Sequence, residues 1–138
     1  MLDAKAVEQL IHQGLPAAAE QQLTVEMVHD NGARLRFPFQ NRYIRPGGTL
    51  SGPTLMGAAD AAMYAAILAN LGALEMAVTQ NLNINFLARP AAKDLIAEAT
   101  ILRRGRRSVV LEVGLFSEGE PDMVAHVTGT YALPHNAT

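Results

Sequence analysis

The chain has 138 residues, which is enough for one domain and too few for two of ordinary size. Hydrophobic residues make up 49% of it and charged residues 17%, so it can bury a core and is not a disordered protein. The net charge of -2 gives no general attraction to nucleic acid or to anionic membranes. The low share of charged residues favours a protein that covers part of its surface by self-association.

Cysteine is absent, which excludes disulfide bonds, thiolate zinc sites and a cysteine nucleophile. The absence also fits a reducing compartment, so we expect a cytoplasmic protein. The histidines are scattered and show none of the spacings of a metal site, so no metal ion is expected. They are His12, His29, His126 and His135.

The first third of the chain predicts a helix followed by a hairpin. Residues 3–13 repeat apolar side chains at helical spacing, which indicates a short amphipathic helix that ends near Gly14. Apolar and polar residues then alternate over about residues 22–39, on both sides of an Asp-Asn-Gly turn at 30–32. This pattern predicts a β-hairpin, and Pro38 marks it as an edge of the sheet.

A long apolar segment follows the hairpin and predicts a helix over about residues 53–71. Ser51 is suited to cap this helix, Pro53 suits its first turn, and Gly72 suits its end. The segment is apolar on nearly every face, so we expect protein around it on all sides. Alanine dominates it and Asp60 lies within it, which argues against a membrane span.

Four strands are expected over about residues 76–133, because apolar and polar residues alternate there between short connections. Short connections favour antiparallel neighbours. The expected fold class is α+β, with residues 1–138 as a single domain in which one antiparallel sheet wraps around a long central apolar helix. Such an arrangement leaves one face or edge of the sheet in need of a partner.

Asp60 is the only charged residue in the predicted central helix, and an isolated buried carboxylate is costly. It can form an ion pair with an arginine such as Arg45, or a polar contact between subunits. It can also act as a general base or nucleophile at the wall of a cleft. Gly52 lies eight residues earlier, and its N–H at the start of the helix can hold a carbonyl oxygen that gains negative charge. Alternatively, Gly52 only serves the turn.

A cluster of arginines surrounds Gly105 and is expected on a turn between two strands. Arginines that project together from a turn suit phosphate groups, such as those of coenzyme A. The alternative is a solvated charged turn with no ligand. The members of the cluster are Arg103, Arg104, Arg106 and Arg107.

Three segments resemble the hotdog-fold acyl-CoA thioesterases of the phenylacetate-pathway (PaaI-like) type. They are GGTLSGPTLMGAADAAMYAA, VTQNLNINFLARPA and GRRSVVLEVGLFSEGEPDMVAHVTGTYAL, and the resemblance covers roughly residues 20–134. In that family a Gly-Thr-hydrophobic-His-Gly-Gly turn opens the central helix, and an acidic residue follows nine positions after the histidine. Here Asp60 lies nine positions after Ser51, which stands in place of the histidine, and Pro53 replaces the second glycine.

The resemblance implies hydrolysis of acyl-CoA thioesters, with coenzyme A as part of the substrate and without a metal or redox cofactor. Asp60 would be the nucleophile or the general base that activates water, and the Gly52 backbone N–H would polarise the thioester carbonyl. The Ser51 hydroxyl would bind the thioester or water. Thr79, from the other subunit, would position the water or the carboxylate, with Gln80 beside it.

The resemblance also implies a homodimer that joins two sheets, or a homotetramer, with the active site between subunits. We expect acyl-CoA as the partner, and neither nucleic acid nor a membrane. The residues expected to bind the substrate and its coenzyme A part are Arg45, Gln80, Arg89, Arg104, Arg106 and Arg107.

Two other functions remain open at this point. A hotdog-fold binding protein would hold acyl-CoA or another acyl ligand without turnover, with Asp60 in a structural ion pair. A hydratase-type hotdog enzyme pairs an aspartate with a histidine near the start of the helix, and residues 40–75 contain no histidine.

Overall fold

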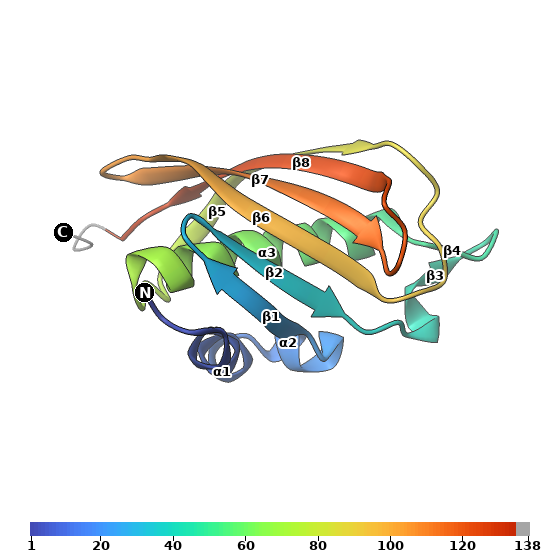
Figure 1. Cartoon of the computed structure of the whole chain (residues 1–138), viewed down its shortest axis with the longest axis horizontal. Helices are drawn as coiled ribbons and strands as arrows, with labels where there is room; N and C mark the ends of the chain where they lie inside the picture. Colours follow the sequence, from blue (N-terminus) through green and yellow to red (C-terminus); the bar gives the residue numbers. More distant parts are fainter. Residues whose placement is uncertain (135–138) are drawn as a thin grey trace.

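A six-stranded antiparallel sheet curls around one long helix, as Figure 1 shows for the computed structural model of the chain. The structure describes residues 1–134, so His135 lies outside the described part. The strands occur across the sheet in the order β1-β2-β6-β7-β8-β5. Their bounds are β1 Thr24–His29, β2 Gly32–Phe37, β5 Val78–Phe86, β6 Leu95–Arg104, β7 Ser108–Ser117 and β8 Met123–Ala132.

The central helix, α3, runs over Gly52–Leu71. Ser51 is its N-cap, and the Thr54 N–H donates to Ser51 Oγ at 3.4 Å. The helix ends at Gly72, whose φ of +98° lies in a region that glycine adopts without strain. By length and apolarity α3 is a candidate membrane span, but 61% of the apolar window is buried within the protein. It is therefore the core helix that the sequence predicts.

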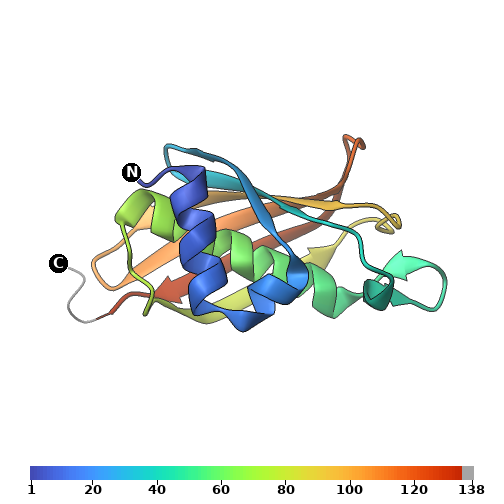
Figure 2. The same ribbon diagram turned by 90° about the horizontal axis from the view of Figure 1, so that it is seen from below.

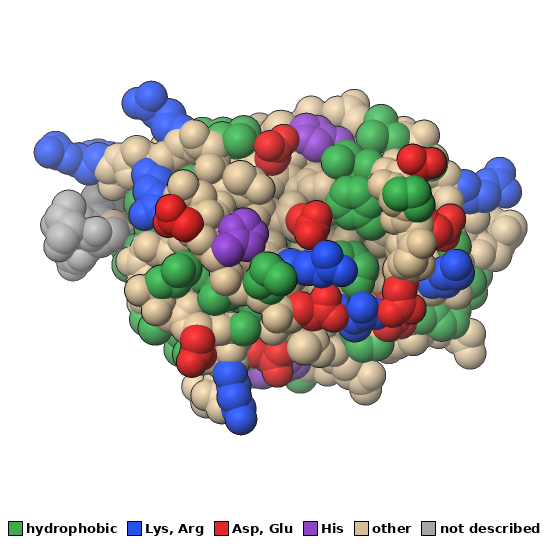
Figure 3. All heavy atoms as spheres, in the orientation of Figure 1, with side chains coloured by type: hydrophobic (Ala, Val, Ile, Leu, Met, Phe, Trp, Pro, Cys, Tyr) green, Lys and Arg blue, Asp and Glu red, His purple; other side chains and the backbone are tan. Residues whose placement is uncertain are grey.

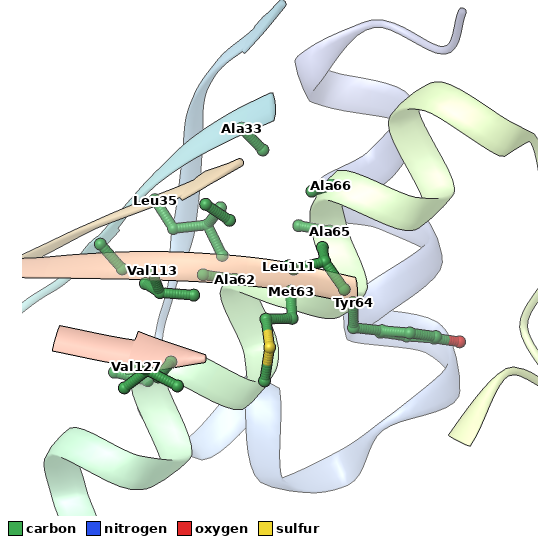
Figure 4. Packing of buried hydrophobic residues seen from close by; sticks show 14 of the residues in the cluster. Ala33, Leu35, Ala62, Met63, Tyr64, Ala65, Ala66, Leu111, Val113 and Val127 are labelled. Atoms are coloured by element: carbon green, nitrogen blue, oxygen red, sulfur yellow. The ribbon is translucent and has the colours of Figure 1, made fainter. Parts of the chain in front are cut away.

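The core forms where small side chains of α3 meet large apolar side chains of the sheet. Figure 4 shows Ala62, Ala65 and Ala66 on the helix, near Leu35 and Leu111 of the sheet. All five side chains are fully buried. Because alanine is short, the helix axis can approach the sheet closely, and the leucines fill the space between them.

Two short helices precede the sheet and lie on the same side of it as α3 (Figure 2). The first, α1, runs over Ala4–Gly14, where the sequence predicts a helix at 3–13, and Asp3 caps it through a 2.8 Å bond from the Ala6 N–H. The second, α2, runs over Pro16–Gln21 and was not expected. Its proline occupies the first turn, where the missing N–H costs nothing, and alanines follow it.

Side chains of α1 satisfy the free edge of β1. The Val25 N–H donates to Glu8 Oε1 at 2.7 Å, and His12 Nε2 lies 2.9 Å from the Leu23 carbonyl oxygen. A sheet edge whose backbone groups already have partners does not pair readily with another strand. The start of the β1 edge is therefore covered by α1.

The other edge of the sheet is formed by β5, which crosses the sheet to pair with β8 instead of with the next strand, β6. In the part of the chain that the structure describes, no strand pairs with the outer side of β5. Two of its apolar side chains are more than half exposed, Val78 at 59% and Phe86 at 55%. An open edge with exposed apolar side chains is the feature expected of an interface.

The prediction that Pro38 marks an edge strand of the sheet was wrong. Pro38 follows the end of β2, and β2 is an interior strand between β1 and β6. Between β2 and α3 the predicted loop contains a 3-10 helix at Asn41–Tyr43 and a small hairpin of β3 Ile44–Arg45 and β4 Thr49–Leu50.

The outer face of the sheet carries a cluster of charged side chains, seen in the centre of Figure 3. Arg36 pairs with Glu26 at 2.6 Å and with Asp94 at 3.0 Å, and it also contacts Glu118. The hydrogen bond from Arg36 holds the pKa of Glu26 below its usual value. These pairs keep this face polar and leave the apolar groups to the inner face and to the β5 edge.

Candidate active site

Asp60 lies in the middle of α3, half-buried, on the side of the helix next to β5 and β8. It opens into a pocket of about 260 Å³. The pocket combines two carboxylates, three hydroxyl groups and a small apolar wall. Its lining residues are Leu15, Asp60, Tyr64, Glu75, Ala77, Val78, Thr79 and Tyr131.

Two hydroxyl groups donate to the same oxygen of the Asp60 carboxylate. Thr79 Oγ1 lies 2.6 Å from Oδ1, and Tyr131 Oη lies 2.6 Å from Oδ1 and 3.0 Å from the Asp60 carbonyl oxygen. Short bonds of this kind are typical of charged acceptors. No donor among residues 1–134 bonds to Oδ2. The arrangement therefore fixes one carboxylate oxygen and leaves the other for chemistry.

The register of the sheet brings the two hydroxyls together. Thr79 on β5 lies directly opposite Tyr131 on β8, so both side chains project from the same face toward α3. Gln80 follows at a β-bulge, where the register between β5 and β8 shifts, and its side chain is exposed. Bulges of this kind often re-aim a side chain beside an active site.

Tyr131 is held rigidly. Its ring stacks on Tyr64, with centroids 6.2 Å apart and an angle of 17° between the planes, and Tyr64 Oη donates to the Glu75 carbonyl oxygen at 2.9 Å. Burial, and then the negative charge of Asp60, raise the pKa of Tyr131 well above its usual value. Tyr131 therefore keeps its proton at neutral pH and acts as a donor.

Tyr131 is the site residue that the sequence did not reveal. In β8 the residues Val127, Gly129 and Tyr131 alternate with polar residues, so the inward orientation of Tyr131 could be read from the pattern. The partner of its hydroxyl could not, because Asp60 is 71 residues away in the chain.

Thr79 contacts Asp60 within one chain, which corrects the expectation that it would come from the other subunit. The alternative of an ion pair between Arg45 and Asp60 is not realised, because the salt bridges among residues 1–134 include neither residue. Arg45 lies on β3 at the other end of α3, beside a second pocket of about 430 Å³. That pocket is also lined by Gly52, Phe86 and Arg89.

Gly52 and Asp60 do not face one carbonyl in a single chain. They open into different pockets, and α3 rises about 12 Å over the eight residues between them. Gly52 itself is next to Phe86, because a Cβ at Gly52 would lie 3.4 Å from the Phe86 ring. The Ser51 hydroxyl is 2.8 Å from Thr54 Oγ1 and serves as the helix cap.

The arginine turn joins β6 to β7 at the Asp60 end of the sheet. Ser108, which follows the turn, is opposite Ala132, and Ala132 is opposite Val78 at the start of β5. Arg104 is already engaged, because its guanidinium donates to Asn31 Oδ1 at 2.7 and 3.1 Å. The two arginines after Gly105 are exposed and lie two strand spacings, about 10 Å, from β5.

Comparison with known proteins agrees with this fold. The family profile described as Thioesterase superfamily matches residues 47–124. A candidate esterase of Saccharolobus solfataricus is 30% identical over 101 residues, which are 73% of this chain and 71% of that protein. A candidate thioesterase of Silicibacter sp. TM1040 has a crystal structure that is 33% identical, with a TM-score of 0.87 over 97% of this chain and 93% of that one.

The PaaI protein from the phenylacetic acid degradation operon of E. coli is more distant in sequence. It is 18% identical, with a TM-score of 0.77 over 94% of this chain and 96% of that one, so this likeness concerns the fold alone. The family assignment therefore rests on the extent of the profile match and on the sequence identity to the Saccharolobus and Silicibacter proteins. This chain belongs to the Thioesterase superfamily and has its hotdog fold.

Proposed function

We propose that this protein is an acyl-CoA thioesterase of the PaaI-like type, with Asp60 as its nucleophile or general base. Membership of the superfamily supports thioester hydrolysis as the type of reaction. The observation that carries the residue assignment is the Asp60 carboxylate, which lines the pocket and whose Oδ1 is held by Thr79 and Tyr131, while Oδ2 has no donor among residues 1–134. A carboxylate oriented in this way is suited to attack or to proton abstraction.

Both roles of Asp60 give the same products. As a base, Oδ2 takes a proton from water, the water oxygen bonds to the thioester carbon, and the carbon–sulfur bond breaks. As a nucleophile, Oδ2 bonds to that carbon first, and water then hydrolyses the resulting anhydride. In either case the sulfur leaves and takes up a proton as free coenzyme A. The carbonyl oxygen gains negative charge, which a backbone N–H such as that of Gly52 stabilises.

The separation of Gly52 from Asp60 within one chain supports a site built from two copies. Thr79, beside Asp60, is at one end of β5, and Phe86, beside Gly52, is at the other end. If the open β5 edges of two copies pair antiparallel about a two-fold axis, the Thr79 end of one lies opposite the Phe86 end of the other. Asp60 of one copy then approaches Gly52 of the second copy.

The same pairing gathers the arginines around one substrate. Arg106 and Arg107 lie at the Asp60 end of one copy, and Arg45 and Arg89 line the Gly52 pocket of the second copy. Guanidinium groups suit the phosphates of coenzyme A. Gln80 is exposed on the edge between them. Hydrolysis without a cofactor and a cytoplasmic location stay predictions. Assembly into a homodimer or a homotetramer is also a prediction.

A binding protein without turnover is the second candidate, and Ser51 is the observation that favours it. The Ser51 hydroxyl is used by Thr54 at the helix cap, and the family's imidazole is missing at this position. In that case the two pockets would hold an acyl-CoA whose thioester stays intact.

Hydrolysis of a panel of short, long and aryl acyl-CoAs, followed by release of free thiol, tests the proposal. Asp60→Asn is expected to lower kcat by about 10²–10⁴-fold, because the amide cannot accept the proton or attack the carbon. Asp122→Asn, at an exposed turn, is the matched control and should behave as wild type. Full activity of Asp60→Asn would show that the Asp60 carboxylate takes no part in the reaction. Tight binding of acyl-CoA without any hydrolysis by wild type would favour the binding protein.

A further inference from the structure

We infer that Tyr131 is a positioning residue for the reaction, whose hydroxyl orients the Asp60 carboxylate so that Oδ2 faces the substrate. This inference rests on the proposed role of Asp60 and adds a residue to it. The primary observation is geometric. Tyr131 Oη makes two contacts with one residue, at 2.6 Å to Asp60 Oδ1 and at 3.0 Å to the Asp60 carbonyl oxygen.

The surroundings of Tyr131 leave its hydroxyl little freedom to point elsewhere. The side chain is 4% exposed, it belongs to an interior strand, and its ring lies against that of Tyr64. Figure 4 shows Tyr64 extending away from the labelled sheet residues, with its hydroxyl at the far end. That hydroxyl is bound to the Glu75 carbonyl oxygen, so the ring that supports Tyr131 is itself fixed.

The second donor makes the orientation specific. A carboxylate held by one hydrogen bond can rotate about its χ2 angle, which is a soft torsion. Thr79 Oγ1 and Tyr131 Oη approach the same oxygen from neighbouring strands, β5 and β8. Rotation of the carboxylate would break both bonds at once. The pair therefore keeps Oδ2 directed into the pocket, and loss of either hydroxyl should let Asp60 turn.

The groups that can change charge around this carboxylate are few. Facing the pocket are Tyr64 on α3, Glu75 on the loop after α3, and Tyr131 on β8, while β5 contributes the neutral Thr79 and the α1–α2 connection contributes Leu15. Burial raises the pKa values of both tyrosines, so they stay neutral around pH 7. The acidic side chains that line the pocket are therefore its two carboxylates, Asp60 and Glu75.

The test replaces Tyr131 with phenylalanine, which keeps the ring stack and removes only the hydroxyl. With the acyl-CoA hydrolysed fastest by wild type, Tyr131→Phe is expected to lower kcat by about 10-fold or more while KM changes less than about two-fold, the size of one lost bond to a charged group. Tyr43→Phe, which removes a hydroxyl bonded to Gln40, is the matched control and should leave both readouts unchanged.

A wild-type kcat in Tyr131→Phe would overturn the inference. A purely structural role would lower the yield of folded enzyme and leave kcat per folded enzyme at the wild-type value. If the variant does not fold, wild type labelled with ¹³C at the tyrosine ring carbons gives an independent readout. The Tyr131 signal should differ between wild type and Asp60→Asn, and the Tyr43 signal should not. A Tyr131 signal that is the same in both proteins would contradict the contact, whether or not thioesters are hydrolysed.

Discussion

The arginines around Gly105 divide into two groups. Arg104 donates to Asn31 and helps to hold the turn between β1 and β2, so two of its nitrogen donors are already used within the chain. Arg106 and Arg107 are exposed on the following turn. Arg103 is exposed as well, next to Arg104 near the end of β6. The hydrogen bonds to Asn31 therefore separate Arg104 from three neighbours that the sequence alone treats alike.

The double variant Arg106→Ala with Arg107→Ala is expected to raise KM for acyl-CoA by about 10-fold, because it removes two charge-assisted contacts to phosphate. The value of kcat should stay within about two-fold, since neither residue lines the pocket of Asp60, the carboxylate proposed to react. Steady-state kinetics at low ionic strength measure both constants. Arg42→Ala, at the opposite end of the molecule beside Glu20, is the control. An unchanged KM would show that the turn is only a solvated charged surface.

Among single residues, spacing and resemblance identified Asp60, Gly52 and Thr79 but not their contacts. Asp60 is conspicuous in its apolar helix, because burying an unpaired charge costs free energy. Arg45 was the obvious ion-pair partner in the sequence, yet the helix carries the two residues to different pockets. Tyr131, the actual donor, belongs to the last strand, and nothing in the local sequence of either residue indicates the contact.

At the level of elements, the approach of α3 to β8 depends on Gly129. A Cβ at this position would lie 2.6 Å from Met63 Sδ and 3.0 Å from the Asn81 carbonyl oxygen. Met63 is fully buried and the Asn81 oxygen belongs to the backbone of β5, so neither can move away without cost. The glycine thus lets the helix, the last strand and the edge strand come together beside Tyr131.

Gly129→Ala is expected to destabilise the protein by about 1–3 kcal/mol, the usual cost of overpacking a core, and to lower Tm by several degrees. Thermal unfolding followed by circular dichroism gives the comparison with wild type. Gly14→Ala is the matched control, because a Cβ there would meet nothing within 4 Å, and its Tm should be unchanged or slightly higher. An unchanged Tm for Gly129→Ala would mean that Met63 finds another rotamer at no cost.

The two edges of the sheet differ. Glu8 of α1 accepts from the Val25 N–H of β1, and His12 lies 2.9 Å from the Leu23 carbonyl oxygen just before β1, whereas β5 keeps apolar side chains exposed. Self-association is thus expected through β5. It would also complete the catalytic site, because Gly52 and Asp60 are too far apart within one chain to act on one carbonyl.

Complementation between two inactive variants tests this arrangement. Asp60→Asn lacks the carboxylate, and Gly52→Val blocks access to the backbone N–H, so each alone should be inactive. The two variants are co-expressed with different tags, and random pairing makes about half of the dimers mixed. Each mixed dimer has one intact site of two, so the mixture should recover about one quarter of wild-type activity. The mixed species, purified through both tags, should have about half of the wild-type activity per dimer, because one of its two sites is intact. A mixed dimer without activity would indicate a site within one chain.

The sequence by itself determined the local structure and the chemical candidates. Periodicity, caps and turn residues act over a few neighbouring positions, which is why the central helix from Ser51 to Gly72, the Asp-Asn-Gly hairpin and four strands can be read from the order of residues. The tertiary structure alone decided that β5 pairs with β8, that Tyr131 donates a hydrogen bond to Asp60, and that Gly52 lines a different pocket from Asp60. These depend on contacts between residues far apart in the chain, and such contacts form only when the whole core packs.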